Sequence, residues 1–482
     1  GLTWAEVSAA PEITGTASGA ITANKAVIVN SNGTLSQPAV TAAAWGTETE
    51  ISTLNPNQNH SIIWVEKHSC FVMAYLDGTD GKIRTGTLSG TTITWNTPAT
   101  ITTDEAQQNR LAYNEQEDIL MLAYRNASQS MRVEVRQVGL SGTTIGTISS
   151  AATPNSNTFT QEIRCTYGAS GKTLVSWKDT AGKCIVATAN STAANHPNCT
   201  STSTIESNNF NTHDCAYDPD SANWCFCWND QDSEAGRSRL ASVDSGNNIT
   251  YSSTADFYNY YSQDIRVTYN TNLNKFHVVF SEQVSGGTEF KMNSAVGTVS
   301  GGAITWASQV EHSGGTGISD KVDYLGAVYN PISYKHEIFW RDKDDSDKLK
   351  TAEITISGTT PSIGSVTTLS NSAVKHQCFP VANNVGAIVN LWDRNDDQYY
   401  IVKSAESTTL TADKFIGFAK AGYSDSATAT VKVVGNTLTG QSGLTPGAKV
   451  YVQGNGDVGT TADLPSVEAG TAISSSTLII KG

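Results

Sequence analysis

Between residues 60 and 404 the hydrophobic and polar positions repeat seven times in one arrangement: an apolar stretch, a polar turn, a second apolar stretch and a polar exit. The first stretches end at Trp64, Tyr113, Tyr167, Tyr217, Tyr269, Tyr329 and Val381. The second stretches end at Tyr75, Tyr124, Trp177, Trp228, Phe280, Trp340 and Trp392. These two ends lie 11 residues apart in six repeats and 10 in the remaining one, whereas successive repeats lie 49 to 60 residues apart. Constant spacing inside the repeats predicts strand hairpins of one geometry, joined by loops of variable length.

A third and a fourth strand-like segment follow most of these hairpins, as in KIRTGTLSG (82–90) and TTITWNTPATIT (91–102). Four antiparallel strands in about 50 residues, repeated seven times, predict a seven-bladed β-propeller. The seventh repeat lacks a fourth strand, but the segment AAWGTETEIST at 43–53 precedes the first repeat and has no hairpin of its own. We therefore expect residues 43–53 to form the outer strand of the blade built from 375–404 and to close the ring.

The two ends of the chain carry similar hairpins, ITANKAVIVNSNGTLSQ at 21–37 and LTPGAKVYVQGNGDVGT at 444–460. Both have an Asn-Gly pair at the tip, which is typical of a type I′ turn because both central residues of that turn need positive φ. We expect the two hairpins to lie in one β domain and to be related by a rough internal symmetry.

The predicted fold is therefore all-β, with a seven-bladed β-propeller inserted in a small β domain built from both chain termini. Residues 1–40 and 405–482 are expected to form the terminal β domain, and residues 41–404 the propeller. A ring that closes on itself explains how two segments so distant in sequence can meet.

Composition and charge exclude several classes of partner. Only 16% of the residues are charged, the net charge is −14 and the pI is about 5.0, which argues against nucleic acid and anionic membranes as partners. No apolar run approaches the ~18 residues of a membrane span. The eight cysteines have no metal-site spacing, and we expect buried free thiols made in a reducing cytoplasm. No cofactor and no metal are predicted.

Two recurrent polar positions are candidates for a site. Three residues before the end of the first stretch stand Arg110, Arg164 and Arg266, with Asp214 in the fourth repeat. Two residues after the end of the second stretch stand Asp77, Asn126, Asp179, Asp230, Glu282 and Asp342. Both positions belong to one face of a propeller, so the arginines are expected to meet a ring of carboxylates around one mouth of the channel.

Two interpretations of this ring remain open. It can consist of salt bridges between blades and of turn-forming aspartates, or it can be a polar funnel that holds a glycan or a partner loop. In the second case the ligand-binding candidates are Arg110, Arg164, Arg266, Asp77, Asp179, Asp230 and Asp342.

Evidence for catalysis is thin. The acidic hairpins at 229–236 and 341–348 lack the order of a calcium loop, and we expect solvated hairpin tips. His60, His213 and His376 precede first strands in different repeats, without the spacing of a nucleophile or metal site. A glycosidase needs two carboxylates that face each other across a sugar, and the S-x-D-x-G-x-x-W motif of sialidase propellers is absent. We therefore predict a protein that is not an enzyme.

The C-terminal part contains TADKFIGFAKAGYSDSATATVKVVG (411–435), GLTPGAKVYVQGNGDVGTTA (443–462) and AGTAISSSTLIIKG (469–482). These segments resemble a β-rich module at the C-termini of tailed-phage virion proteins, notably those of marine phages: fibres, tail appendages and capsid-decorating proteins. The resemblance covers about a sixth of the chain. It implies a structural virion component.

We therefore expect a virion protein that docks on other virion proteins through its β domain, presents the propeller for adhesion to a glycan or protein of the host surface, and forms a homo-oligomer. The alternatives are a carbohydrate-active enzyme, a glycosidase or lyase, on the same scaffold, and a secreted lectin-like binding protein. The expected location is the virion, with the extracellular space as the alternative.

Overall fold

The computed structural model describes residues 11–52, 60–154, 160–207, 210–283, 290–313, 318–394, 397–463 and 465–481, and these residues form an all-β protein, as predicted. The chain divides into two compact units: unit 1 comprises residues 1–44 and 405–482, and unit 2 comprises residues 45–404. Within the described ranges the helical elements are short 3₁₀ turns at Glu66–His68 and Ala127–Gln129. No helix in these ranges is long and apolar enough to span a membrane.

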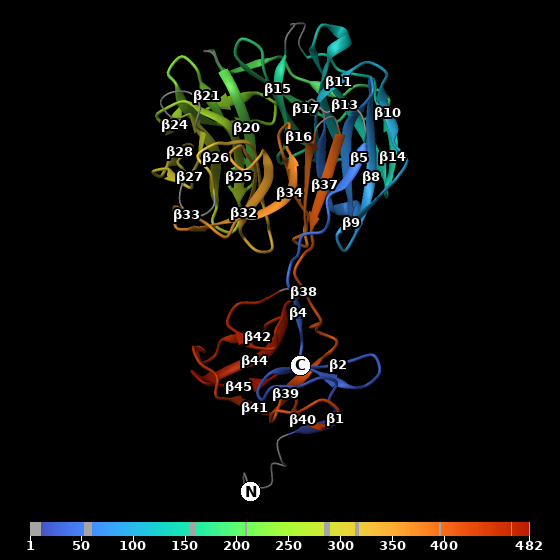
Figure 1. Cartoon of the computed structure of the whole chain (residues 1–482), viewed down its shortest axis with the longest axis vertical. Coiled ribbons are helices and arrows are strands. Elements are labelled where there is room, and N and C mark those ends of the chain that lie inside the picture. The colour runs from blue at the N-terminus through green and yellow to red at the C-terminus, as the bar shows by residue number, and fades with distance from the viewer. Residues whose placement is uncertain are drawn as a thin grey trace. The chain divides into compact units, whose positions relative to one another are not determined.

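The described residues of unit 2 form seven antiparallel sheets, here called blades 1 to 7 (Figure 1). Blade 1 contains β6 (Ser61–Val65), β7 (Cys70–Asp77), β8 (Asp80–Ser89), β9 (Thr92–Trp95) and β10 (Ala99–Thr102). Blade 2 contains β11 (Ala106–Asn114), β12 (Ile119–Asn126), β13 (Arg132–Ser141) and β14 (Thr144–Ile148). Blade 3 contains β15 (Gln161–Tyr167), β16 (Lys172–Lys178), β17 (Gly182–Thr188), β18 (Asn198–Cys199) and β19 (Ser203–Glu206).

The remaining blades have the same order of strands. Blade 4 contains β20 (Phe210–Asp218), β21 (Asn223–Asp230), β22 (Ala235–Val243), β23 (Ile249–Tyr251) and β24 (Ala255–Tyr258). Blade 5 contains β25 (Ser262–Asn270), β26 (Lys275–Gln283), β27 (Phe290–Ser300), β28 (Ala303–Trp306) and β29 (Val310–Glu311). Blade 6 contains β30 (Val322–Tyr329), β31 (His336–Asp342), β32 (Lys348–Ser357), β33 (Thr360–Ile363) and β34 (Thr367–Ala373). Blade 7 contains β35 (Phe379–Ala382), β36 (Ile388–Arg394), β37 (Asp397–Lys403) and β5 (Thr49–Ser52).

The first strands of the blades line the axis of a ring. Each contacts the first strand of the next blade, in the order β6, β11, β15, β20, β25, β30 and β35, and β35 contacts β6 again. Large side chains fill the space between blades. The residues at which the second apolar stretches end include Trp177, Trp228, Trp340 and Trp392, here called anchors, and all four are fully buried. Packing the sheets around an axis buries apolar faces that a single sheet would leave in water. The predicted β-propeller fold is confirmed.

Strand β5 closes the ring as expected. It pairs with β37 through Glu50 opposite Tyr399 and Thr49 opposite Tyr400, and Trp45 forms an isolated bridge with Lys403. Residues 49–52 therefore complete blade 7 from the N-terminal side. Position 53, the last of the expected segment, lies outside the described residues.

The outer strand is interrupted in most blades, which the sequence pattern did not predict. In blade 1 the segment expected as one strand forms β9 and β10, which pair separately with β8. Asn96 donates its side-chain amide to Thr85 Oγ1 over 2.8 Å, and Pro98 has no N–H for the ladder. Blades 3, 4, 5 and 6 have two outer strands in the same arrangement.

Asparagine side chains join neighbouring blades at the turns between first and second strands. Asn330 accepts from the N–H of Ile332 within its own turn and donates 3.0 Å to the carbonyl of Gly386 in blade 7. Asn114 donates in the same way to Gly171 of blade 3. One side-chain amide thus accepts a hydrogen bond from an N–H of its own turn and donates one to a carbonyl of the next blade.

Unit 1 contains two five-stranded sheets with the same strand order. The first has the order β1 (Glu12–Thr16), β40 (Thr428–Lys432), β39 (Phe415–Ala419), β2 (Ala26–Val29) and β3 (Leu35–Ser36). The second has the order β41 (Thr437–Thr439), β45 (Thr477–Ile480), β44 (Val467–Ser474), β42 (Lys449–Val452) and β43 (Val458–Gly459). A short pair of β4 (Val40–Thr41) with β38 (Ser407–Thr408) joins the segments that lead into and out of residues 45–404.

Equivalent glycines identify the two sheets as copies of one module. Gly417 has φ of 144° and Gly470 has φ of 155°, and a Cβ at either would lie 2.0 Å from the carbonyl oxygen of Lys432 or 1.9 Å from that of Ile479. The expected relation between the hairpins therefore extends to the whole module. In the second copy a short connection joins β43 to β44, and at the equivalent place in the first copy the chain contains all of unit 2.

The hairpin turns differ from the predicted type. Gly33 and Gly456 have positive φ of 81° and 85°, but Asn32 and Asn455 are not among the residues with positive φ. Gly33 N–H donates to the carbonyl of Asn30 over 2.9 Å, as in a type I turn that ends in a left-handed glycine. The prediction of type I′ turns was wrong because each loop is longer than two residues.

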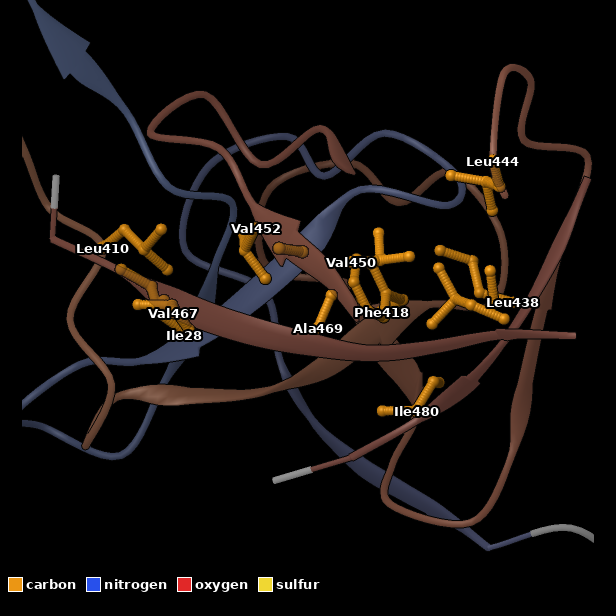
Figure 2. Close-up of a cluster of buried hydrophobic side chains, with 13 residues drawn as sticks. Ile28, Leu410, Phe418, Leu438, Leu444, Val450, Val452, Val467, Ala469 and Ile480 are labelled. Atoms are coloured by element: carbon orange, nitrogen blue, oxygen red, sulfur yellow. The ribbon is translucent and has the colours of Figure 1, made fainter. Parts of the chain in front are cut away.

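The core of unit 1 contains side chains from both copies. Figure 2 shows Ile28 and Phe418 of the first copy with Val450, Val467 and Ile480 of the second, all buried in one cluster. The two hairpins also bond directly, because Ala26 N–H donates to the carbonyl of Gly456 over 2.8 Å. The copies thus form one body with a shared interior.

Candidate functional site

A β-bulge stands at the start of the first strand in five consecutive blades, 2 to 6. In four of them the residue inside the bulge has a left-handed backbone: Gln108, Glu162, Asp264 and Tyr324, with φ between 47° and 54°. Such φ values are uncommon outside glycine, and bulges often re-aim a side chain next to a functional site. Here the bulge decides which residue of each first strand faces the channel.

The channel arginines stand two residues after the left-handed bulge residue of their blades and face the axis. Arg110 lies opposite Ala123, Arg164 opposite Ser176, Asp214 opposite Cys227 and Arg266 opposite Val279 in their respective hairpins. The arginines therefore occupy equivalent places on the channel wall, as the sequence predicted. They line a cavity of about 160 Å³, the channel cavity, with Ser61, Ile62, Asp214, Ala327, Cys378, Phe379 and Pro380.

Each arginine is held by carbonyl or carboxylate oxygens. Arg164 donates from Nε to Asp214 Oδ1 over 3.0 Å and from Nη1 to the carbonyl of Ile163 over 2.9 Å. Arg266 donates 2.6 Å to the carbonyl of Ile265. A guanidinium keeps its charge in proteins, so burial requires such acceptors.

Arg110 completes the set from blade 2. It donates 2.7 Å to the carbonyl of Asn109 and 3.3 Å to that of His60. Its guanidinium also lies 4.5 Å from the ring centroid of Phe379, a cation–π contact. The expectation that each arginine bonds a carboxylate or carbonyl of its own or an adjacent blade is confirmed.

The charged groups around the channel cavity act on one another. Burial lowers the pKa of the Arg110 guanidinium well below its usual range, and the charges of Arg164 and Arg266 add to that shift. Burial also lowers the pKa of His213 well below its ordinary value, again with help from Arg164. Burial and the charge of Asp323 raise the pKa of the bulge residue Asp264 to about 6. Mutual repulsion of the three guanidinium groups favours a negative charge among them.

Under Arg110 and Phe379 lies a buried carboxylate between two histidines. Asp393 has Oδ1 3.2 Å from His60 Nδ1 and Oδ2 3.3 Å from His376 Nδ1, at ion-pair distance but without hydrogen-bond geometry. Burial raises the pKa of Asp393, but the two histidines outweigh that effect and bring the pKa to about 2. His213, by contrast, bonds Ser176 Oγ over 2.9 Å. His60 and His376 thus share a partner that the sequence did not indicate.

The expected carboxylate ring does not bind the arginines. Asp230 accepts from Arg237, and Asp342 accepts 2.9 Å from Lys350 Nζ, in both cases from the next strand of the same blade. Asp179 accepts 2.9 Å from the N–H of Ala181 within its turn. This part of the prediction was wrong, because a cross-strand partner seven or eight residues later is nearer than the channel wall.

The fourth aspartate of that ring, Asp77, lies at the end of β7 opposite Asp80 of β8. Its charge acts on Tyr75 and Arg84 of the same blade. In the hairpin at 341–348, Asp345 pairs with Lys348 and Lys350. Asp344 pairs with Lys321 and Asp347 with Arg341, so these carboxylates are engaged by cations.

Each of the eight cysteines is a free thiol, and six of them are buried. Cys225 and Cys227 have sulfur atoms 3.8 Å apart on one face of β21. Burial raises the pKa of Cys227 well above its ordinary value. The prediction of buried thiols is confirmed for these six, whereas Cys165 and Cys199 are half-buried. The redox state of the surrounding compartment stays a prediction.

Sequence reasoning missed the bulge residues and the apolar side of the channel cavity. A signal for the bulge is present, because Gln-Gln-Asn-Arg at 107–110, Gln-Glu-Ile-Arg at 161–164 and Gln-Asp-Ile-Arg at 263–266 repeat one pattern. Phe379 and Pro380 had no such signal, since the seventh repeat departs from the others at these positions.

A second, larger hollow of about 420 Å³ lies between loops of blades 2 and 3 and is lined by Ala151, Ala152, Thr153, Pro154, His196, Pro197, Cys199, Thr200 and Ser201. It brings no cluster of charged side chains together. We therefore take the channel cavity as the candidate site, because convergent polar groups rather than volume mark a binding site.

No family model matches the chain, and no curated protein matches it. Among solved structures the chain is similar to the β-propeller domain of Cps50 (Swd1) from Myceliophteria thermophila, at 6% identity and a TM-score of 0.47, over 76% of this chain and 100% of that one. It is also similar to a protein of unknown function from Dyadobacter fermentans, at 10% identity and a TM-score of 0.40, over 75% and 99%.

A leech intramolecular trans-sialidase, solved with 2,7-anhydro-Neu5Ac, matches at 10% identity and a TM-score of 0.39, over 74% of this chain and 68% of that one. Identities and TM-scores at this level concern the β-propeller scaffold and carry no argument about ligand or activity.

Proposed function

We propose that the chain is a non-enzymatic binding protein of a tailed-phage virion: a fibre, appendage or decoration protein. Unit 2 binds a host-surface ligand in the channel cavity, and unit 1 docks on other virion proteins. The observation that supports binding is the convergence of three buried arginines from blades 2, 3 and 5 on one cavity. Nε of Arg110 and Nη2 of Arg266 have no acceptor among the described residues, and such buried donors are rare in proteins and need an explanation.

Docking by unit 1 is supported by its surface. Eight large hydrophobic side chains are exposed among the described residues, and five of them, Ile13, Val40, Val434, Ile473 and Ile479, belong to unit 1. Among the described residues β1 also stands at the edge of its sheet, with β40 as its strand partner and an isolated bridge from Ala17 to Leu35 just after it. Exposed apolar side chains and a free edge suit contact with another protein or with a second copy of this chain.

One observation favours the enzyme alternative. A carboxyl with a pKa near 6, such as Asp264, is poised for acid–base chemistry. Asp214, the carboxylate that lines the channel cavity, argues against catalysis. Its oxygens accept hydrogen bonds from Arg164 Nε and from the N–H of Val267, over 3.0 Å each. A carboxylate engaged in this way is a poor proton donor or nucleophile.

Two experiments test the proposal. An antibody to unit 1 should label phage particles in electron micrographs, and labelled full-length protein should bind cells of the host bacterium. Arg110→Gln should reduce cell binding, whereas Arg132→Gln, a change of equal charge on the third strand of blade 2, should leave it intact. Absence of the chain from particles, or hydrolysis of bacterial polysaccharides that Asp264→Asn abolishes, would overturn the proposal.

A further inference from the structure

The channel cavity has two chemically different halves. Arg110, Arg164 and Arg266 come from blades 2, 3 and 5, and Ile62, Ala327, Phe379 and Pro380 come from blades 1, 6 and 7. Asp214 is the one carboxylate among the lining residues, so these residues carry three positive charges and one negative charge. Glu162 lies 3.4 Å from Arg164 and the charge of Asp264 acts on Arg266, so three carboxylates balance the three guanidinium charges. Unpaired N–H donors, rather than net charge, distinguish this half of the cavity.

Two donors of the cationic half have no acceptor in the part of the chain that the structure describes. They are Nε of Arg110 and Nη2 of Arg266. Both residues are only 6% exposed. A buried guanidinium N–H without an acceptor is unfavourable, whereas one that bonds an anion gains a short, charge-assisted bond. Arg110 and Arg266 can therefore accommodate an acceptor that the protein itself does not provide.

The apolar half narrows the chemistry of that acceptor. An inorganic oxyanion would gain nothing from Phe379, Pro380 and Ala327, because its whole surface is polar. An organic carboxylate has a charged end for the arginines and carbon atoms for the apolar side chains. The volume of about 160 Å³ exceeds several times the ~30 Å³ that one water takes in the liquid. A carboxylate with part of a sugar ring fits such a space, and an oligosaccharide does not.

We infer that the channel cavity binds the carboxylate of an acidic sugar that projects from the host surface, with Arg110 Nε and Arg266 Nη2 as its donors and Phe379 and Pro380 beside its carbon atoms. This inference rests on the proposed binding function and names its ligand class. Planar guanidinium groups match carboxylates better than a lysine would, which accounts for the use of arginine in three blades.

The test is calorimetric titration of the full-length protein with D-glucuronate, and with D-glucose, acetate and sulfate as separate probes. We expect glucuronate to bind at least tenfold more tightly than glucose or sulfate, and more tightly than acetate because acetate lacks the ring. Arg110→Gln should weaken glucuronate binding at least tenfold. Arg132→Gln is the matched control and should leave the affinity unchanged.

A second variant keeps the test decisive if Arg110→Gln folds poorly. Ala327→Leu fills the apolar half without a change in charge and should abolish glucuronate binding while acetate binding persists. Equal affinity for glucose and glucuronate, or tighter binding of sulfate, would overturn the inference, as would absence of binding by every probe. If glucuronate binds but Arg110→Gln leaves cell attachment intact, the proposed function fails and the inference stands. If Arg110→Gln abolishes cell attachment but the wild-type protein does not bind glucuronate, the inference fails and the proposed function stands.

Discussion

Asp214→Asn tests whether the channel arginines depend on their one lining carboxylate for stability. Asp214 accepts from Arg164 Nε and from Val267 N–H, both over 3.0 Å. Its side chain is 17% exposed. An asparagine has one acceptor oxygen, so its NH₂ group must face one of these two donors.

The expected loss can be worked from this geometry. Opposite charges about 4 Å apart interact by about 4 kcal/mol at an effective dielectric constant of about 20. Removal of one partner of a buried ion pair costs about 3–5 kcal/mol because the other charge stays buried. Since Asp214 retains some exposure, we expect the free energy of unfolding of unit 2 to fall by about 3 kcal/mol. The double variant with Arg164→Gln should recover at least about 1 kcal/mol, because it also removes the stranded charge.

Tryptophan fluorescence in a guanidinium chloride titration can follow this loss. Nine of the ten tryptophans lie in residues 45–404, so the signal reports unit 2 in the full-length chain. Asp256→Asn is the control, because Asp256 pairs with Arg237 at the surface and exposed pairs contribute little. The reasoning is refuted if Asp214→Asn unfolds within about 0.5 kcal/mol of the wild type, or if the double variant is no more stable than the single one.

Three further predictions concern the rest of the molecule. Gly470→Ala should destabilise unit 1 by about 3 kcal/mol or more, since the new Cβ would lie 1.9 Å from the carbonyl oxygen of Ile479; thermal unfolding measures it. Asn330→Asp should cost unit 2 about 1 kcal/mol, because an ionised aspartate cannot donate to Gly386; denaturant titration measures it. Acid should destabilise unit 2 through His336, whose pKa burial lowers to about 3. The unfolded chain then binds the extra proton below pH ~6.5, so stability falls between pH ~6.5 and 3, by at most about 5 kcal/mol for this group.

Each of these predictions has a control or a contradicting outcome. Gly443→Ala changes a glycine with positive φ but no neighbour within 4 Å, so it should cost less than Gly470→Ala. Asn330→Ala should be at least as harmful as Asn330→Asp, because it also loses the acceptor of the turn. The assignment to His336 would be contradicted if the free energy of unfolding of His336→Asn fell between pH ~6.5 and 3 as steeply as that of the wild type.

The sequence was a good guide to the fold because its pattern reports burial. The anchors Trp177, Trp228, Trp340 and Trp392 mark the same place in each blade and are all fully buried. The absent fourth strand of the seventh repeat likewise pointed to residues 43–53. The interrupted outer strands were missed because outer strands are short and half-exposed, so neither their apolar period nor their pairing is strongly imposed.

The site was predicted in part. Spacing placed Arg110, Arg164 and Arg266 correctly on the channel wall, because each stands three residues before the tyrosine that ends its first apolar stretch. It failed for Asp230 and Asp342, since periodicity gives the face of a strand but not which of several cations is nearest. The left-handed bulge residues follow from how the first strands meet at the axis, and local propensity carries no sign of that constraint.

The position of unit 2 inside the first copy of the duplicated module has a consequence for the order in which the chain can fold. Glu12 pairs with Lys432 and Glu50 pairs with Tyr399, so each of these early strands finds its partner 420 or 349 residues later in the chain. At about 5–20 residues per second, β1, β2 and β3 wait roughly 20–80 s for β39 and β40. The second copy spans 437–480 and can form as soon as it is made. Two sheets therefore stay incomplete while the rest of unit 2 is made, and β37, β39 and β40 complete both.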